Sequence, residues 1–199
     1  MRLLRLPGLH HDSSAILISN QDESILINPG TSWYQVLLAA RIESLSYNPN
    51  QIWLTHRHYN VAGAAFYLSE QWGSKVYCHS EACSSLAIGE VLTTNARAFD
   101  SEMALTPTTS FDIGSNLLIG SLEIEVMELP GHTSCGVGFY LPKYSLLIAG
   151  GVICAADRVA RWDFPTGSRT KLFQSLKRVS ELNLSTLIPL NGPAILEEE

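Results

Sequence analysis

One short segment of the chain places two histidines where a metal ion could be bound. Leu54-Thr55-His56-Arg57-His58 ends an apolar run and separates two imidazoles by one residue. Two imidazoles spaced in this way in an extended loop can converge on one metal ion, since each supplies a neutral nitrogen at about 2.0–2.1 Å from zinc. Taken alone, the pair is weak evidence for a metal site, because two histidines in a loop are more often surface residues that have no chemical role.

A second segment places another histidine in a turn. Leu129-Pro130-Gly131-His132-Thr133 combines Pro, Gly and His directly after a strand-like run. Turns of this composition present side chains at the edge of a sheet, where ligands gather.

The elements around these turns alternate between hairpins and βα units. Strands are predicted at 14–19, 24–28, 52–54, 75–78, 117–119, 122–128, 136–141, 145–149 and 186–189, and helices at 33–42, 61–72 and 168–182. The order runs twice through hairpins followed by βα units. This order predicts an α/β fold, a four-layer αββα sandwich of two mixed sheets with helices outside, formed by residues 1–199 as a single domain.

Composition excludes several classes of partner. The chain has 199 residues, 46% of them hydrophobic and 16% charged, and a formal net charge of −6. An acidic chain lacks the basic patch that nucleic acid or an anionic membrane requires, so neither partner is expected. With no apolar run long enough for a membrane span or a signal peptide, we expect a cytoplasmic protein. Its four cysteines are expected to be buried small hydrophobic residues rather than disulfides.

Nearly the whole chain resembles the metallo-β-lactamase superfamily. The segments that carry the resemblance occur in the family's order: Ile27-Asn28-Pro29-Gly30 is similar to its Ile-Asp-Pro-Gly turn, Thr55 to Ala64 to its Thr-His-x-His-x-Asp-His-x-Gly-Gly signature, and Pro130-Gly131-His132-Thr133 to its Pro-Gly-His-Thr motif. Ala-Arg-Trp-Asp-Phe-Pro at 160–165 is similar to the Gly-Arg-x-Asp-Phe-Pro stretch of glyoxalase II-like and persulfide dioxygenase-like members. The resemblance implies the αββα sandwich of that family.

The same resemblance implies that the family's two-metal centre is altered here. Four of the seven ligand positions differ: Asn60 stands for Asp, Val61 for His, Gly151 for the bridging Asp and Asn191 for the last His. Valine and glycine side chains cannot bind a metal, and neutral amides are poor zinc ligands. The histidines that remain, His56, His58 and His132, correspond to one complete site. The resemblance therefore implies at most one zinc ion, not a dinuclear centre.

Two functions follow from the resemblance. The first is a glyoxalase II-like hydrolase that acts on a small thioester, ester or amide. Asn60 is then the candidate catalytic residue because it stands at the position of the family's Asp, although an amide cannot accept a proton as a carboxylate does. The second is a non-catalytic pseudoenzyme that uses the fold as a binding or assembly module. The chain ends soon after Asn191, so the C-terminal helical domain of glyoxalase II is expected to be absent.

Several further residues have a structural and a functional interpretation. His10 and His11 are expected to be exposed loop residues, and His79 to lie in the cap region of a helix. Asp157 is a candidate substitute carboxylate. Arg161 and Asp163, which lie in the glyoxalase II-like stretch, are expected to pair with each other. The high apolar fraction also leaves room for a homodimer.

Overall fold

The computed structural model describes residues 1–155 and 158–196, and these residues divide into two compact units. Residues 1–111 and 119–122 form the first unit, and residues 112–118 with the described residues from 123 onward form the second. Two six-stranded mixed sheets are present, as predicted, and helices accompany each of them. The single-domain organisation stays a prediction.

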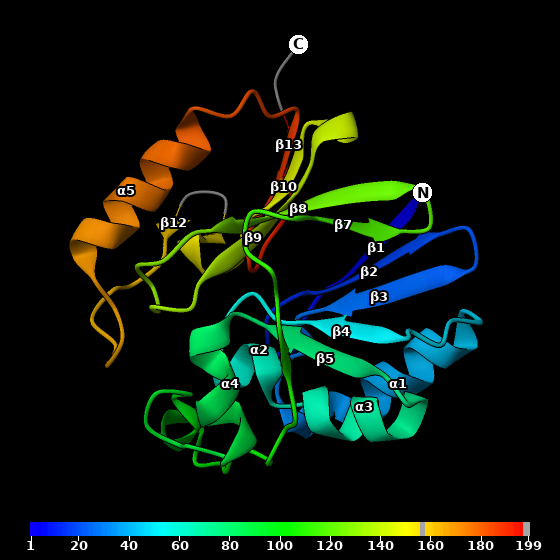
Figure 1. Cartoon of the computed structure of the whole chain (residues 1–199). Helices are drawn as coiled ribbons and strands as arrows, with labels where there is room; N and C mark the ends of the chain where they lie inside the picture. Colours follow the sequence, from blue (N-terminus) through cyan, green and yellow to red (C-terminus); the bar gives the residue numbers. More distant parts are fainter. Residues whose placement is uncertain (156–157, 197–199) are drawn as a thin grey trace. The chain divides into compact units, whose positions relative to one another are not determined.

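The sheet of the first unit contains its strands in sequence order. They are β1 (Arg2–Leu6), β2 (Ala15–Asn20), β3 (Glu23–Ile27), β4 (Gln51–Trp53), β5 (Lys75–Cys78) and β6 (Thr109–Ser110). The first three strands are antiparallel, and β3 to β6 are parallel (Figure 1). The hairpin β2–β3 and the strands β4 and β5 confirm the prediction. The sequence pattern did not reveal β1 or β6.

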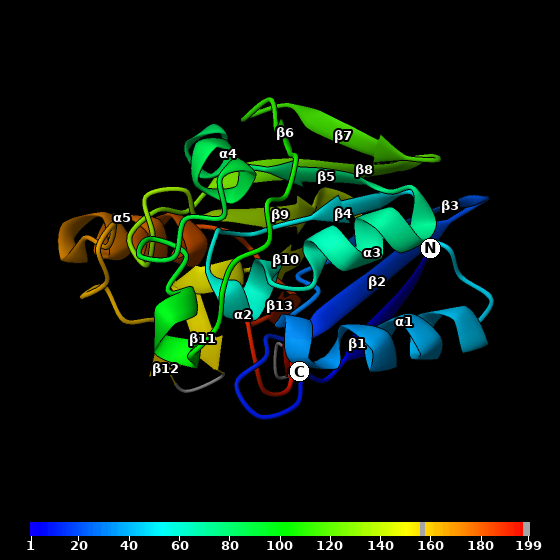
Figure 2. The ribbon, with the colours of Figure 1, turned by 90° about the horizontal axis from the view of Figure 1, so that it is seen from below.

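Helices follow the parallel strands of this sheet. They are the 3₁₀ helix η1 (Ser32–Tyr34), α1 (Gln35–Ser44), α2 (Tyr59–Ala62), α3 (Ala65–Trp72), α4 (Ser80–Ala87) and η2 (Ala96–Phe99). Helix α3 packs against β4, β5 and α1. Figure 2 shows α1 and α3 in front of the strands, and Figure 1 shows both helices on the same side of the sheet.

The helix predicted over residues 61–72 is interrupted. The amide of Ala64 donates to the carbonyl oxygen of Gly30 at 2.9 Å, and the carbonyl of Val61 accepts from the amide of Gly30 at 3.1 Å. These bonds to a distant turn replace the helical bonds of two residues, so α2 ends at Ala62 and α3 begins at Ala65. Gly73, with φ of 67°, ends α3 as predicted.

The central strands of the first unit are buried on both faces. Ile16, Leu17 and Ile18 of β2, and the run Ile25 to Ile27 of β3, are each exposed by 1% or less. Strands buried on both faces are continuous apolar runs and lack the alternation of strands with one solvated face. Because β3 and β4 end inside this core, the turns that follow them are held on rigid strands.

Most of the other six-stranded sheet belongs to the second unit. Its strands are β7 (Asn116–Ile119), β8 (Leu122–Glu128), β9 (Val137–Leu141), β10 (Leu146–Ile148), β13 (Thr186–Ile188) and β14 (Ile195–Leu196), in the order β14-β13-β10-β9-β8-β7. Two 3₁₀ helices, η3 (Pro142–Tyr144) and η4 (Gly150–Val152), and a pair of short strands, β11 (Ile153–Ala155) and β12 (Arg158–Val159), lie between these elements.

Helix α5 (Arg169–Ser180) closes the core of the second unit. Ser168 caps its first turn by accepting from the amide of Lys171 at 3.4 Å. The buried side chains of Leu172 and Val179 pack in one cluster with Leu129, Leu147 and Val152. This helix matches the predicted amphipathic segment at 168–182. No helix within residues 1–155 and 158–196 is long and apolar enough to cross a membrane.

Candidate metal centre

Two hydrogen bonds hold the loop that carries His56. The side-chain oxygen of Asn28 accepts from the amide of Thr55 at 2.9 Å and from its hydroxyl at 3.0 Å. Asn28 adopts a positive φ of 54°, a conformation that asparagine tolerates better than most residues. The backbone N–H of Asn28 also donates to the carbonyl of Trp53 at 3.0 Å. The ends of β3 and β4 are therefore joined through Asn28, immediately before the His-x-His segment.

The same contacts determine the tautomer of His56. The side-chain atom of Asn28 that accepts from the Thr55 amide is its oxygen, which has no proton to donate. The Thr55 hydroxyl, which contacts the same oxygen, must therefore donate its only proton to it. The Nδ1 atom of His56 lies 3.1 Å from this hydroxyl oxygen and must therefore donate to it. Nδ1 therefore carries a proton, so in the neutral ring Nε2 has the lone pair that a metal requires.

His58 lies close to His56. Both side chains are buried, and their ring centroids are 4.9 Å apart with an angle of 78° between the rings. His58 is in extended conformation at the start of α2, where its carbonyl accepts from the amides of Val61 and Ala62, and its side chain does not cap the helix. The backbone thus places two imidazoles side by side.

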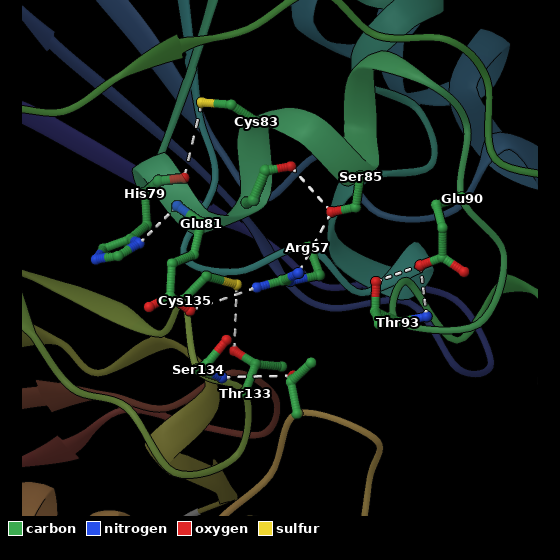
Figure 3. A network of polar contacts seen from close by, with 12 residues as sticks. Arg57, His79, Glu81, Cys83, Ser85, Glu90, Thr93, Thr133, Ser134 and Cys135 are labelled. Atoms are coloured by element: carbon green, nitrogen blue, oxygen red, sulfur yellow. Dashed lines mark hydrogen bonds and ion pairs between the residues drawn. The ribbon is translucent and has the colours of Figure 1, made fainter.

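Arg57, between the two histidines, is buried against α4. Its Nη1 atom lies 3.4 Å from the Ser85 hydroxyl and its Nη2 atom 3.9 Å from a Glu81 carboxylate oxygen. Figure 3 shows the guanidinium extended toward this helix. The ring of His79 accepts from the amide of Glu81 at 3.1 Å, which confirms the prediction that His79 lies in a cap region.

In the second unit, His132 lies in the turn after β8. Gly131 has φ of 134°, and a Cβ atom there would come within 2.2 Å of the Leu172 amide nitrogen. Only glycine can therefore occupy this position, where the turn meets α5. The carbonyl of Gly131 accepts from the Ser168 amide at 2.8 Å, and the Ser175 hydroxyl donates to the Pro130 carbonyl at 2.7 Å. The first turns of α5 fix the backbone that presents His132.

His132 also has a defined tautomer. Its Nδ1 atom lies 2.7 Å from the carbonyl oxygen of Arg161, which can only accept, so Nδ1 carries the proton and Nε2 the lone pair. Burial lowers the pKa of His132 below its usual value, although the bond to Arg161 opposes this shift. A neutral imidazole with its lone pair on Nε2 is the form that binds zinc.

The glyoxalase II-like stretch supplies this carbonyl. The guanidinium of Arg161 forms two bonds with the carboxylate of Asp163, at 2.9 and 2.7 Å, as predicted for a structural pair. These hydrogen bonds, with the attraction of the opposite charges added to them, lower the pKa of Asp163 and raise the pKa of Arg161. The ring of Phe164 packs edge to face with His132, at 5.2 Å between centroids.

The residues at the altered ligand positions have structural roles. Asn60 is half-buried in α2, and its carbonyl accepts from the Ser13 amide at 2.9 Å. Val61 is fully buried. Gly151 lies in η4, where the positive φ belongs to its neighbour Gly150. The backbone N–H of Asn191 donates to the Cys154 carbonyl at 2.9 Å.

The remaining candidates lie outside the histidine loop. His10 and His11 are exposed, as predicted, and their rings pack against Tyr34 and Phe99. Asp157 lies outside the described residues, so its proposed role as a carboxylate is untested. No pattern in the sequence indicated the contacts that orient His56 and His132, apart from the Asn at an Asp position in the turn at 27–30.

The comparisons with known proteins agree along most of the chain. The model of the metallo-beta-lactamase superfamily matches residues 10–190. The hydroxyacylglutathione hydrolase GloC of Haemophilus influenzae is 27% identical over 185 residues, which are 92% of this chain and 82% of that protein.

Two solved structures are similar over nearly their full length. TTHA1623, in a di-iron-bound form, is 26% identical with a TM-score of 0.82, over 97% of this chain and 94% of that chain. The B3 metallo-beta-lactamase BLEG-1 is 22% identical with a TM-score of 0.83, over 98% and 94%. These matches confirm the predicted fold class. The chain belongs to the metallo-β-lactamase superfamily, with glyoxalase II-type hydrolases among its relatives.

Proposed function

We propose that this protein is a metal-dependent hydrolase whose histidines His56, His58 and His132 hold one zinc ion. The observation that carries the proposal is the hydrogen bond that two of these rings form through Nδ1. His56 and His132 each donate through Nδ1, to Thr55 and to the Arg161 carbonyl respectively, which leaves Nε2 as the ligand atom. Such orientation of an imidazole by a second partner is typical of metal-binding histidines.

The three histidines are a donor set that suits a single metal ion of intermediate softness, such as zinc. Three neutral imidazoles leave one coordination position open, as in catalytic zinc sites. A bound zinc ion would supply a Lewis acid that polarises a carbonyl oxygen and acidifies water. The relative TTHA1623 is described in a di-iron-bound form, so iron is the competing occupant.

The substrate that we propose is a small thioester, ester or amide. Support comes from the hydroxyacylglutathione hydrolase GloC, which matches 92% of this chain. Asn60 would orient a substrate or water through its amide, because an amide donates and accepts hydrogen bonds but cannot take up a proton. We therefore expect hydrolysis to be slow compared with that by relatives that have a carboxylate at this position.

Metal analysis of the purified protein tests this proposal. We expect about one zinc ion per chain by mass spectrometry of the metal content, with iron measured in the same sample. His58→Ala should lose the metal, whereas His10→Ala, a change to an exposed loop histidine, should retain it. Thioester hydrolysis that a chelator abolishes would support the catalytic role. A wild-type protein that binds neither metal when zinc or iron is added would favour the non-catalytic binding or assembly module.

We also propose that the protein forms a homodimer, on the basis of its apolar composition. Light scattering coupled to size-exclusion chromatography should give twice the monomer mass. A monomer mass at the highest concentration that remains soluble would contradict it.

A further inference from the structure

Two of the four cysteines are in contact in the first unit. The sulfur atoms of Cys78 and Cys83 lie 3.5 Å apart, and no disulfide joins them. Cys78, the last residue of β5, is buried, and Cys83 is half-buried in the first half of α4. The strand and the helix are adjacent in the chain, and the turn at His79 brings the two sulfurs together.

The turn between the two cysteines is tightly bonded. The amide of Glu81 donates to the ring of His79 at 3.1 Å, and the Cys83 thiol contacts the carbonyl of His79 at 3.8 Å (Figure 3). The two sulfurs are therefore held near each other by the start of α4. A disulfide bond is about 2.05 Å long, so the sulfurs need to approach by only about 1.5 Å.

We propose that Cys78 and Cys83 form a dithiol that a peroxide oxidises to an intramolecular disulfide. The thiolate of Cys83, the more accessible of the two, attacks one peroxide oxygen. The O–O bond breaks, the leaving hydroxide takes up the proton that Cys83 has lost and becomes water, and Cys83 becomes a sulfenic acid. The sulfur of Cys78 then attacks the sulfur of Cys83, the S–O bond breaks, and the departing hydroxide takes the Cys78 proton as water. Two thiols and one hydrogen peroxide thus give one disulfide and two waters.

The position of this pair gives the oxidation a structural consequence. Helix α4 contacts Arg57, the residue between His56 and His58, through Ser85 and Glu81. The disulfide would bond β5 covalently to that helix. The modification site is separate from the three histidines, so it can be tested independently of whether the protein binds metal.

Peptide mapping after peroxide treatment tests this inference. The folded full-length protein is treated with hydrogen peroxide, free thiols are alkylated, and the protein is digested without reduction. We expect the product in which Cys78 is linked to Cys83, lighter by two hydrogen atoms, to be about tenfold or more abundant than a product with any other cysteine pair. The reason is that these two sulfurs already lie close together. Addition of a dithiol reductant should restore both alkylated cysteines.

Two variants provide controls. Cys83→Ser should abolish the link, whereas Cys154→Ser, at a half-buried cysteine of the second unit, should leave it unchanged. Wild-type protein in which Cys78 and Cys83 both remain alkylatable after the peroxide treatment would overturn the proposal. Oxidation of Cys83 to sulfinic acid without any link to Cys78 would also overturn it. In that case Cys78 would not reach the sulfenic acid of Cys83 before this acid is oxidised further.

Discussion

The side-chain oxygen of Asn28 accepts both of the protons that Thr55 can donate, one from its amide at 2.9 Å and one from its hydroxyl at 3.0 Å. The hydroxyl oxygen is thereby left as the acceptor for Nδ1 of His56, at 3.1 Å. Asn28, which follows β3, thus determines that Nδ1 of His56, in the turn after β4, carries a proton.

Replacement of the Thr55 hydroxyl should weaken metal binding without unfolding the protein. Thr55→Val keeps the side-chain volume and the amide bond to Asn28 but removes the acceptor for His56. We expect the affinity for zinc to fall about 10- to 100-fold, as for other losses of a partner to a metal-binding histidine. Competition against a chromogenic chelator measures the change. Thr109→Val, at an exposed threonine of β6, is the matched control, and equal affinities in the two variants would refute the orienting role of Thr55.

Asn28 should also contribute to stability. Asn28→Ala leaves two donors of Thr55 without their acceptor and places alanine at a positive φ, so we expect a loss of about 2–4 kcal/mol in the free energy of unfolding. Asn28→Asp retains the acceptor and the tolerance of this backbone conformation, and should remain close to the wild type. Urea denaturation of both variants measures this difference. Equal losses for alanine and aspartate would show that the acceptor is unimportant.

The buried carboxyl of Asp12 should make stability depend on pH. Burial raises the pKa of Asp12, against the lowering effect of hydrogen bonds from Thr31. A carboxyl group with a raised pKa in the folded state stabilises the fold only while protonated, so its contribution falls as pH rises from the unfolded value through the folded one. Asp12→Asn keeps an oxygen that can accept from the Thr31 amide but cannot ionise. The free energy of unfolding of Asp12→Asn, taken relative to that of the wild type, should therefore increase from pH 4 to pH 7 in urea titrations. A difference that is constant over this range would show that Asp12 does not titrate abnormally.

The two-metal centre of the family should be recoverable by substitution. Asn60→Asp, Val61→His, Gly151→Asp and Asn191→His together restore the four altered positions. Gly151 is not among the residues with a positive φ, so an aspartate there meets no left-handed backbone. Val61 is fully buried, and the larger imidazole should cost about 1–3 kcal/mol.

We expect this quadruple variant to bind about two metal ions and to gain weak thioesterase or esterase activity over the natural chain. Metal content and hydrolysis rates are measured together, with folding checked by circular dichroism. A folded quadruple variant that still binds one ion or none would show that the second site has no room for a metal, and would end the idea of a latent hydrolase scaffold.

Local patterns in the sequence determined most of the elements and the ligand types. The hairpin of β2 and β3, the buried strands β4 and β5, and helix α5 follow from apolar spacing and capping residues only a few positions apart. The His-x-His pair and the Pro-Gly-His-Thr turn could be named for the same reason, because each lies within a handful of consecutive residues at a strand end.

Tertiary structure alone decided the features that depend on residues far apart in the chain. The helix predicted at 61–72 is interrupted because the Ala64 amide bonds to Gly30. The tautomers of His56 and His132 depend on Asn28 and on the Arg161 carbonyl, and these partners come from other strands and loops. Hydrogen bonds between distant segments form only once the chain has folded, and no periodicity of neighbouring residues encodes them. The sequence therefore determined which side chains could bind a metal, and the folded structure decided in which protonation state two of them are held.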